Sequence, residues 1–202
     1  MLVTEPCAKL CEIVEEAVAG GVSVIQVRDK GAPAEDLLAT TKRIKAVVRD
    51  QACILVNGSA EIAARVQLDG VHLPEHGDSV ANARRILGAE KQIGRSVHSL
   101  EAALAAERDG ADYVIAGTIF ASSSHPGETP AGLGFLANVC RAVSIPVLAI
   151  GGVTAENCAD CIAAGAAGVA VLSPIINAED PFVAATMYLL ALPQHSSRMS
   201  TG

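Results

Sequence analysis

Short runs of apolar and β-branched residues recur along the whole chain and alternate with longer, alanine-rich stretches. The runs are nearly continuous in apolar residues, which is typical of strands that are buried on both faces of a parallel sheet. Eight strands are predicted, at Leu2–Thr4, Val22–Arg28, Cys53–Asn57, Gly70–Leu73, Gln92–His98, Tyr113–Phe120, Pro146–Gly151 and Gly168–Ser173.

The alanine-rich stretches between these runs predict helices. Ser99 and Thr154 come directly before two of them, where N-cap residues are expected. Gly20 and Gly165 directly follow two of them, as glycines at helix C-termini commonly do. The predicted helices are Lys9–Ala19, Ala34–Asp50, Ala60–Val66, Val80–Leu87, Leu100–Asp109, Gly132–Val143, Ala155–Ala164 and Pro181–Leu192.

The strict alternation of strand and helix predicts an α/β fold with a parallel sheet, and eight such units favour a closed (β/α)₈ TIM barrel. A doubly wound open sheet is the alternative, but it usually has about five or six strands, so two predicted strands would have to be wrong. We expect a single barrel domain over residues 1–192, followed by a polar C-terminal tail over residues 193–202 that frays.

Composition narrows the class of protein. The chain has 202 residues, 50% apolar content and only 18% charged residues, which suits one well-formed core and excludes a disordered chain. No apolar run reaches about 18 residues and no signal peptide is visible, so we expect a cytoplasmic protein without a membrane partner. The net charge of −7 argues against nucleic acid as a partner, and a homo-oligomer is left open.

The six cysteines do not indicate a disulfide framework, because their spacing is uneven. The pairs Cys158/Cys161 and Cys7/Cys11 fall on predicted helices or at their starts, and no second pair of zinc ligands accompanies them. We therefore interpret them as small core residues. No cluster of aspartates indicates a clamp for a divalent cation, so no metal site is predicted.

Polar residues gather where the predicted strands end, which is where the active site of this architecture lies. Gln26, Arg28 and Lys30 alternate along the second strand, and His72 lies near the end of the fourth. Buried polar groups on one strand face need a ligand or partners, so a substrate-binding role is favoured. The alternative is that the strand has already ended and that Arg28 and Lys30 are solvated.

Loops after the seventh and eighth strands commonly bind phosphate in such barrels, through backbone N–H groups and a helix N-terminus. Here the seventh strand runs into Gly151-Gly152, and the eighth ends at Leu172-Ser173. Glycine lets the backbone approach an anion closely, although a Gly-Gly pair can also be a simple tight turn. These four residues are predicted to bind a phosphate group.

The longest connection, residues 121–131, follows the sixth strand and is rich in Ser, Gly and Pro. Such a loop is either a lid or a loose connection. It carries His125, and an imidazole can exchange a proton near neutral pH. His98, at the end of the fifth strand, is a second candidate for this role.

Several segments together resemble the superfamily of thiamine-phosphate synthase and its TenI-type thiazole tautomerase relatives, over nearly the whole chain. The resemblance implies a (β/α)₈ barrel, in agreement with the strand count. Its segments are 24–30 (VIQVRDK), 55–58 (LVNG), 70–74 (GVHLP), 93–99 (IGRSVHS), 110–114 (GADYV), 119–120 (IF), 149–153 (AIGGV) and 165–173 (GAAGVAVLS).

The synthase branch joins a pyrimidine diphosphate to a thiazole phosphate with the help of magnesium. Its Gln-x-Arg-x-Lys motif, which holds the diphosphate, is kept here in residues 26–30. Its Asn-Asp motif reads Asn57-Gly58, and Gly77 stands at its second metal-ligand position, with Asp78 one residue away. Its phosphate-binding lysine after the sixth strand is replaced by His125. Loss of these carboxylates removes the oxygen ligands that Mg²⁺ requires.

The tautomerase branch needs no such carboxylates, and residues 93–101 and the Leu73-Pro74 step are more similar to it. Its reaction is a proton shift that makes a thiazole carboxylate phosphate aromatic. The catalytic histidine of this branch lies just after the position of Gly117, where this chain has Thr118. The resemblance therefore favours a metal-independent thiazole tautomerase, an isomerase of thiamine biosynthesis that acts on a phosphorylated thiazole without a cofactor.

In this interpretation His125 is the principal acid/base group and His98 the second candidate. Two alternatives remain open. One is a magnesium-dependent thiamine-phosphate synthase with a rearranged metal site that uses Asp78 and Glu75. The other is a non-catalytic binder or regulator of the thiamine pathway. The candidate substrate-binding residues are Gln26, Arg28, Lys30, Asn57, Ser96, Thr118, Ser122 and Ser124.

Overall fold

Eight parallel strands form the centre of the protein in the computed structural model, which describes residues 1–122, 127 and 129–192. Each strand pairs with the next one along the chain, and a bridge between Leu2 and Val171 joins the first strand to the end of the last. The strands are β1 (Leu2–Val3), β2 (Val24–Val27), β3 (Cys53–Asn57), β4 (Gly70–Leu73), β5 (Gln92–Val97), β6 (Tyr113–Ala116), β7 (Val147–Ile150) and β8 (Gly168–Ala170).

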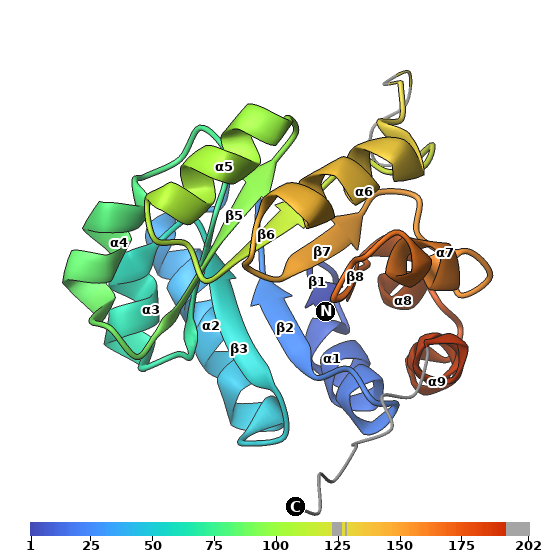
Figure 1. The fold of residues 1–202 in the computed structure, drawn as a ribbon. Helices are drawn as coiled ribbons and strands as arrows, with labels where there is room; N and C mark the ends of the chain where they lie inside the picture. The colour runs from blue at the N-terminus through green and yellow to red at the C-terminus, as the bar shows by residue number, and fades with distance from the viewer. Residues whose placement is uncertain (123–126, 128, 193–202) are drawn as a thin grey trace, which may run out of the picture.

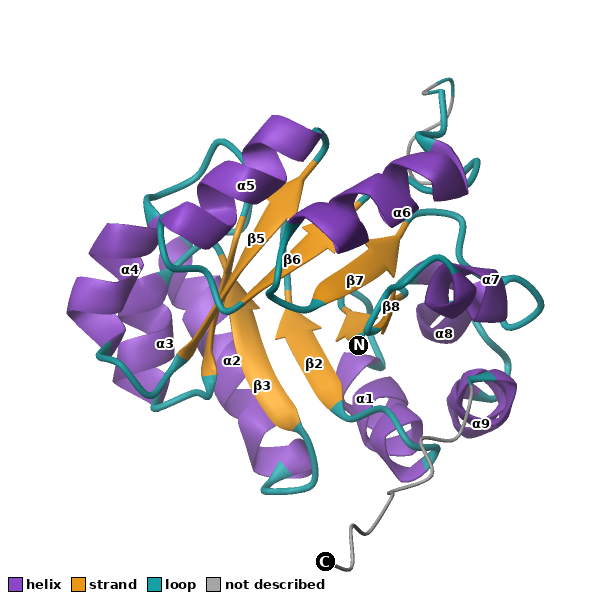
Figure 2. Ribbon diagram, in the orientation of Figure 1, coloured by secondary structure: helices purple, strands orange, loops and turns teal. Residues whose placement is uncertain are grey.

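Helices surround this sheet on the outside (Figures 1 and 2). The predicted (β/α)₈ barrel is thus confirmed, and the doubly wound alternative is wrong. The helices are α1 (Leu10–Ala19), α2 (Ala34–Val48), α3 (Ala60–Val66), α4 (Val80–Leu87), α5 (Leu100–Arg108), α6 (Gly132–Ala142), α7 (Cys158–Ala163), α8 (Ser173–Ile176) and α9 (Pro181–Ala191).

Two local predictions at helix starts are corrected. The short helix α8 begins at Ser173, which was expected to end the last strand. Helix α7 begins at Cys158 and not at Ala155, because the Thr154 carbonyl accepts the amides of Asn157 and Cys158 in a turn. Ser99 does cap α5 as predicted, with its hydroxyl accepting the Ala102 amide at 3.1 Å.

The apolar residues separate into two cores. A large core fills the space between the strands and the surrounding helices. A small cluster fills the barrel interior, where residues from alternate positions of the strands face one another. Its buried members are Val3, Leu55, Tyr113, Ile115 and Ala170.

The strands are anchored at their starting ends by two aspartates that directly precede strands. The Asp69 carboxylate accepts the Ile54 amide of β3 at 2.7 Å, and the Asp112 carboxylate accepts the Ile93 amide of β5 at 2.6 Å. Arg84 also donates to Asp112 at 2.7 Å. These bonds satisfy backbone donors at the N-terminal end of the barrel, where residues usually serve stability.

The cysteines follow the prediction only in part. Cys158 and Cys161 of α7 are fully buried, as expected of core residues. Cys7 is exposed, so the interpretation as a core residue is wrong for it, whereas Cys11 is half-buried and packs against the large core. Among the described residues, none of the helices could cross a lipid bilayer. The predicted tail, residues 193–202, lies outside the described residues.

Candidate active site

The C-terminal ends of the strands bring polar side chains together at one end of the barrel. Gln26 of β2 is only 3% exposed, and its side-chain oxygen accepts a hydrogen bond from the Asn57 amide of β3 at 3.2 Å. The Gln26 amide nitrogen lies 3.6 Å from the sulfur of Met1. The orientation of the Gln26 side chain is therefore set by its neighbours, and the half-buried Asn57 side chain joins it to the open end.

The two cations of the Gln-x-Arg-x-Lys segment follow directly after β2. Arg28 is half-buried, and its backbone amide donates to the hydroxyl of the buried Thr4 at 3.0 Å. Lys30 is exposed. The backbone of Arg28 is thus fixed at the barrel end, while both charged groups stay near solvent. This arrangement can attract an anionic ligand without burying an unpaired charge.

A second polar group lies on the next strand, where His72 of β4 pairs in register with Asn57 of β3. The ring of His72 in β4 is 1% exposed, with Nε2 at 2.8 Å from the Ser96 hydroxyl of β5 and Nδ1 at 3.1 Å from the Tyr113 hydroxyl of β6. Burial, and next the nearby charge of Arg95, lower the pKa of His72 to about 3. His72 is therefore neutral at physiological pH and does not exchange protons there.

The structure connects Ser96, a predicted binding residue, to two residues that were not predicted as site residues. His72 was recognised only as a polar group near a strand end, and Tyr113 only as part of an apolar strand. A histidine within a fully buried strand was the available signal, because its two ring nitrogens require partners.

The glycine pair after β7 is positioned by close packing as well as by its backbone conformation. Gly151 and Gly152 have φ angles of +94° and +62°. A Cβ atom on Gly151 would lie 2.4 Å from the Thr118 methyl group, and one on Gly152 would lie 2.2 Å from the Ala121 carbonyl oxygen. The Phe120 amide also donates to the Gly151 carbonyl at 2.9 Å. Only glycine fits here, and Thr118 is thereby placed beside the predicted phosphate loop.

The last strand leads into α8 directly at the predicted phosphate residues. Leu172 is the residue before the helix and Ser173 is its first residue. Barrels of this kind commonly place a short extra helix after the eighth strand, with its N-terminus at the phosphate site. The order of elements after β7 and β8 matches this arrangement, and the phosphate-binding role of these residues stays a prediction.

The histidine candidates are not brought together. The His98 side chain is 60% exposed and its Nδ1 contacts the Glu75 carboxylate, and its hydrogen-bond partners among the described residues do not include Ser96. Arg95 donates to the backbone carbonyls of Glu75 and Asp78, which ties β5 to the loop after β4. Ser122 is half-buried after β6. Ser124 and His125 lie outside the described residues.

The magnesium site that the resemblance implies is not formed by the described residues. Gly58, which is exposed, follows Asn57. The Asp78 carboxylate accepts the Ser79 amide and the side chain of Asn82 at the start of α4, and these bonds hold the pKa of Asp78 below its usual range. No cluster of three or more acidic, histidine or cysteine side chains suited to a metal occurs in the described part of the chain. The described residues thus offer no preformed cluster of ligands for Mg²⁺.

Fold and site together define a (β/α)₈ barrel with polar and cationic side chains at the C-terminal ends of its strands. Residues 1–175 match the family model described as thiamine monophosphate synthase, TMP-TENI. The chain belongs to this family, and its members are enzymes of thiamine biosynthesis.

Curated relatives and a solved structure agree with this assignment. The chain is 42% identical to the thiamine-phosphate synthase of Roseiflexus sp. (strain RS-1), over 85% of this chain and 74% of that protein. It is 45% identical to the thiamine-phosphate synthase of Anaeromyxobacter dehalogenans (strain 2CP-C), over 84% and 77%. The thiamine phosphate pyrophosphorylase structure from Pyrococcus furiosus is 34% identical, covers 94% of both chains and has a TM-score of 0.84.

These relatives correct the expectation of a thiazole tautomerase. Relatives that are 40–45% identical to this chain are named thiamine-phosphate synthases. The expectation of a tautomerase is therefore wrong, and the synthase alternative is favoured. The tautomerase interpretation depended on His125, which lies outside the described residues, or on His98 as the acid/base group. The histidine that contacts Ser96 is His72, and its burial keeps it neutral.

Proposed function

We propose that this protein is a thiamine-phosphate synthase, a transferase that joins a hydroxymethylpyrimidine diphosphate to a thiazole phosphate. The proposal is supported by the names of its curated relatives and carried by one observation in the structure. Gln26 and Asn57 are hydrogen-bonded at the C-terminal end of the barrel, directly beside Arg28. The Gln-x-Arg-x-Lys segment is thus held at the end where such barrels carry out their chemistry.

The reaction needs two anionic groups to be held on opposite sides of the reacting atoms. The bond between the pyrimidine methylene carbon and the diphosphate oxygen breaks, and the electron pair leaves with the diphosphate. The thiazole ring nitrogen forms the new bond to that carbon. Arg28 and Lys30 stabilise the negative charge that grows on the leaving diphosphate. Gly151, Gly152, Leu172 and Ser173 receive the phosphate of the thiazole.

Magnesium would neutralise further charge on the diphosphate when it is bound. Because the described residues form no preformed magnesium site, charge stabilisation and phosphate binding are assigned to the protein side chains and backbone. The assay therefore includes magnesium and, in parallel, a chelator, so that both conditions are covered.

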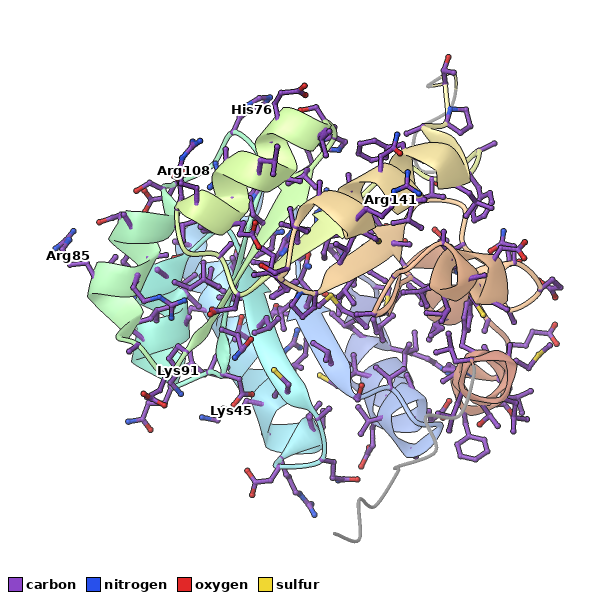
Figure 3. All side chains as sticks on the ribbon, viewed as in Figure 1. Lys45, His76, Arg85, Lys91, Arg108 and Arg141 are labelled. Atoms are coloured by element: carbon purple, nitrogen blue, oxygen red, sulfur yellow. The ribbon has the colours of Figure 1, made fainter. Side chains whose placement is uncertain are left out.

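The test is direct. The purified protein is incubated with hydroxymethylpyrimidine diphosphate and thiazole phosphate, and release of diphosphate and formation of thiamine phosphate are measured. We expect turnover, and we expect Arg28→Gln to lower kcat/KM by about 10²–10³, since it removes a charge that stabilises the leaving group. Arg85→Gln is the control, because Arg85 lies on α4 and points away from the barrel (Figure 3). Absence of product in both conditions, with inorganic diphosphate still binding, would contradict the proposal and favour a non-catalytic binder.

A further inference from the structure

Three side chains on neighbouring strands form a hydrogen-bonded series that runs from the barrel interior to its open end. Tyr113 lies in the interior cluster, His72 lies above it, and Ser96 is half-buried at the end. The His72 and Tyr113 rings are 5.7 Å apart and inclined by 32°. Both ring nitrogens of a neutral histidine are occupied, one as donor and one as acceptor, and the partners decide which is which.

The Tyr113 hydroxyl decides the direction of the series. Within the described residues, His72 is its sole hydrogen-bond partner. The hydroxyl is buried and burial raises the pKa of Tyr113, so it keeps its proton. A buried hydroxyl proton without an acceptor is costly, and Nδ1 of His72 is the acceptor within reach. Tyr113 therefore donates to Nδ1, which leaves the ring proton on Nε2.

The remaining bond then has a fixed direction. The Nε2–H group of His72 donates to the Ser96 oxygen at 2.8 Å. Because that oxygen accepts this bond, the proton of the Ser96 hydroxyl points elsewhere. Ser96 is half-buried near the C-terminal end of β5, where a ligand at that end of the barrel can accept this proton. With the opposite tautomer, Ser96 would use its proton on His72 and offer only lone pairs to a ligand.

We propose that His72 is a positioning residue that, together with Tyr113, fixes Ser96 as a hydrogen-bond donor to an acceptor atom of the substrate. His72 takes no part in proton transfer, because it is neutral throughout the physiological range. The series thus makes Ser96 selective: a ligand with an oxygen or an unprotonated ring nitrogen at this position is bound, and one with an N–H group there is disfavoured. The kinetic consequences below rest on the proposed synthase function, whereas the tautomer itself does not.

The tautomer is measured directly by ¹⁵N NMR of the histidine rings in the ligand-free protein between pH 8 and pH 5. We expect one buried ring with its proton on Nε2 and no titration in this range. If this buried ring carries its proton on Nδ1, or if it titrates near pH 6.5, the proposal is wrong. This measurement needs no substrate, so it decides the proposal even if the coupling reaction is not found.

Variants separate positioning from simple structural support. In the coupling assay Ser96→Ala and His72→Leu should each raise KM by about 10-fold with kcat nearly unchanged, the effect of losing one hydrogen bond made equally in ground and transition states. His72→Gln should restore KM to within about 3-fold, because its amide can accept from Tyr113 and donate to Ser96. Tyr113→Phe should raise KM by an intermediate factor, since it removes the bias on the tautomer.

The matched control is Thr41→Val, which removes a fully buried hydroxyl that donates to the Leu37 carbonyl within α2. It should lower the stability without changing KM. If His72→Gln and His72→Leu give the same KM, or if KM follows stability across all variants, His72 is only a packing residue and the proposal is wrong.

Discussion

The aromatic ring of Tyr113 lies directly against the backbone of Gly94 on the neighbouring strand inside the barrel. A Cβ atom on Gly94 would lie 2.0 Å from Cζ of that ring. Gly94→Ala should therefore force the ring to move and lower the free energy of unfolding by about 1–3 kcal/mol. Urea denaturation measures this change.

Gly134→Ala is the matched control for that substitution. Gly134 lies in α6, and nothing is within 4 Å of a Cβ atom built there. Alanine should stabilise this position by about 0.5–1 kcal/mol, because it restricts the unfolded chain and favours the helix. If both substitutions change the free energy of unfolding equally, the contact between Gly94 and Tyr113 does not restrict residue size at position 94.

The buried His72 should lower the free energy of unfolding as the pH falls below about 6.5. Its pKa is about 3 in the folded protein and about 6.5 in the unfolded chain. Above pH 6.5 both states are neutral, and the stability is fully present. As the pH falls from 6.5 towards 3, only the unfolded state gains this proton, so stability is lost at up to about 1.4 kcal/mol per pH unit.

Denaturant unfolding of the wild type and of His72→Gln at pH 7, 6 and 5 checks this dependence. The difference between the two proteins should shrink as the pH falls, since the variant lacks the titrating group. Thr41→Val serves as the control, because it removes a buried hydroxyl and no titrating group, so its pH dependence should match that of the wild type. Parallel pH curves for the wild type and His72→Gln would contradict the prediction.

Asp112 should contribute to stability and not to catalysis. Its carboxylate accepts the Ile93 amide at the N-terminal end of the barrel. Asp112→Ala leaves that backbone donor without its partner, at a cost of about 1–3 kcal/mol. Asp109→Ala should cost less than about 0.5 kcal/mol, since the Asp109 carboxylate is exposed and lies 3.7 Å from Arg108. Thermal unfolding measures the loss of stability, and the coupling assay at 25 °C measures catalysis. If kcat of Asp112→Ala falls in that assay, Asp112 contributes to catalysis as well and the prediction is wrong.

Inorganic phosphate should bind at the loops after β7 and β8. In a titration followed by amide NMR, the amides of Gly151, Gly152 and Ser173 should shift. Those of Gly88 and Gly110, which end α4 and follow α5, should not. Gly152→Ala should weaken binding by at least about 10-fold, because its backbone conformation and its contact with the Ala121 carbonyl both exclude a side chain. Shifts confined to other loops would remove the phosphate assignment.

The fold could be predicted from the sequence because its signals are local and repeated. The bounds of β3, β4, α3 and α4 agree with the prediction to the residue. The strand β6 ends at Ala116 and not at Phe120, because the apolar run continues after sheet pairing stops, when residues 119–120 bond to the end of β7. Helix α8 was missed, since four residues are too few to carry a helical period.

The site could be predicted only where polarity marks it. Gln26 is detected because a polar side chain in a buried strand is unusual, and the structure pairs it with Asn57. Tyr113 looks like any apolar strand residue, and its role follows from its contact with His72, two strands away. The expectation of a tautomerase is wrong because it depended on a few missing carboxylates, whereas similarity over 84–85% of the chain favours the synthase.

The closure of the barrel has a consequence for the order in which the chain is made. The Met1 amino group bonds to the Val169 carbonyl, 168 residues away, and the Val3 amide donates to Val171. During synthesis on the ribosome, β1 is made first, and its free edge stays unpaired until β8 has been synthesised. During this interval both margins of the sheet are open to other chains, so aggregation at this stage will depend on synthesis speed and chaperones more than on final stability.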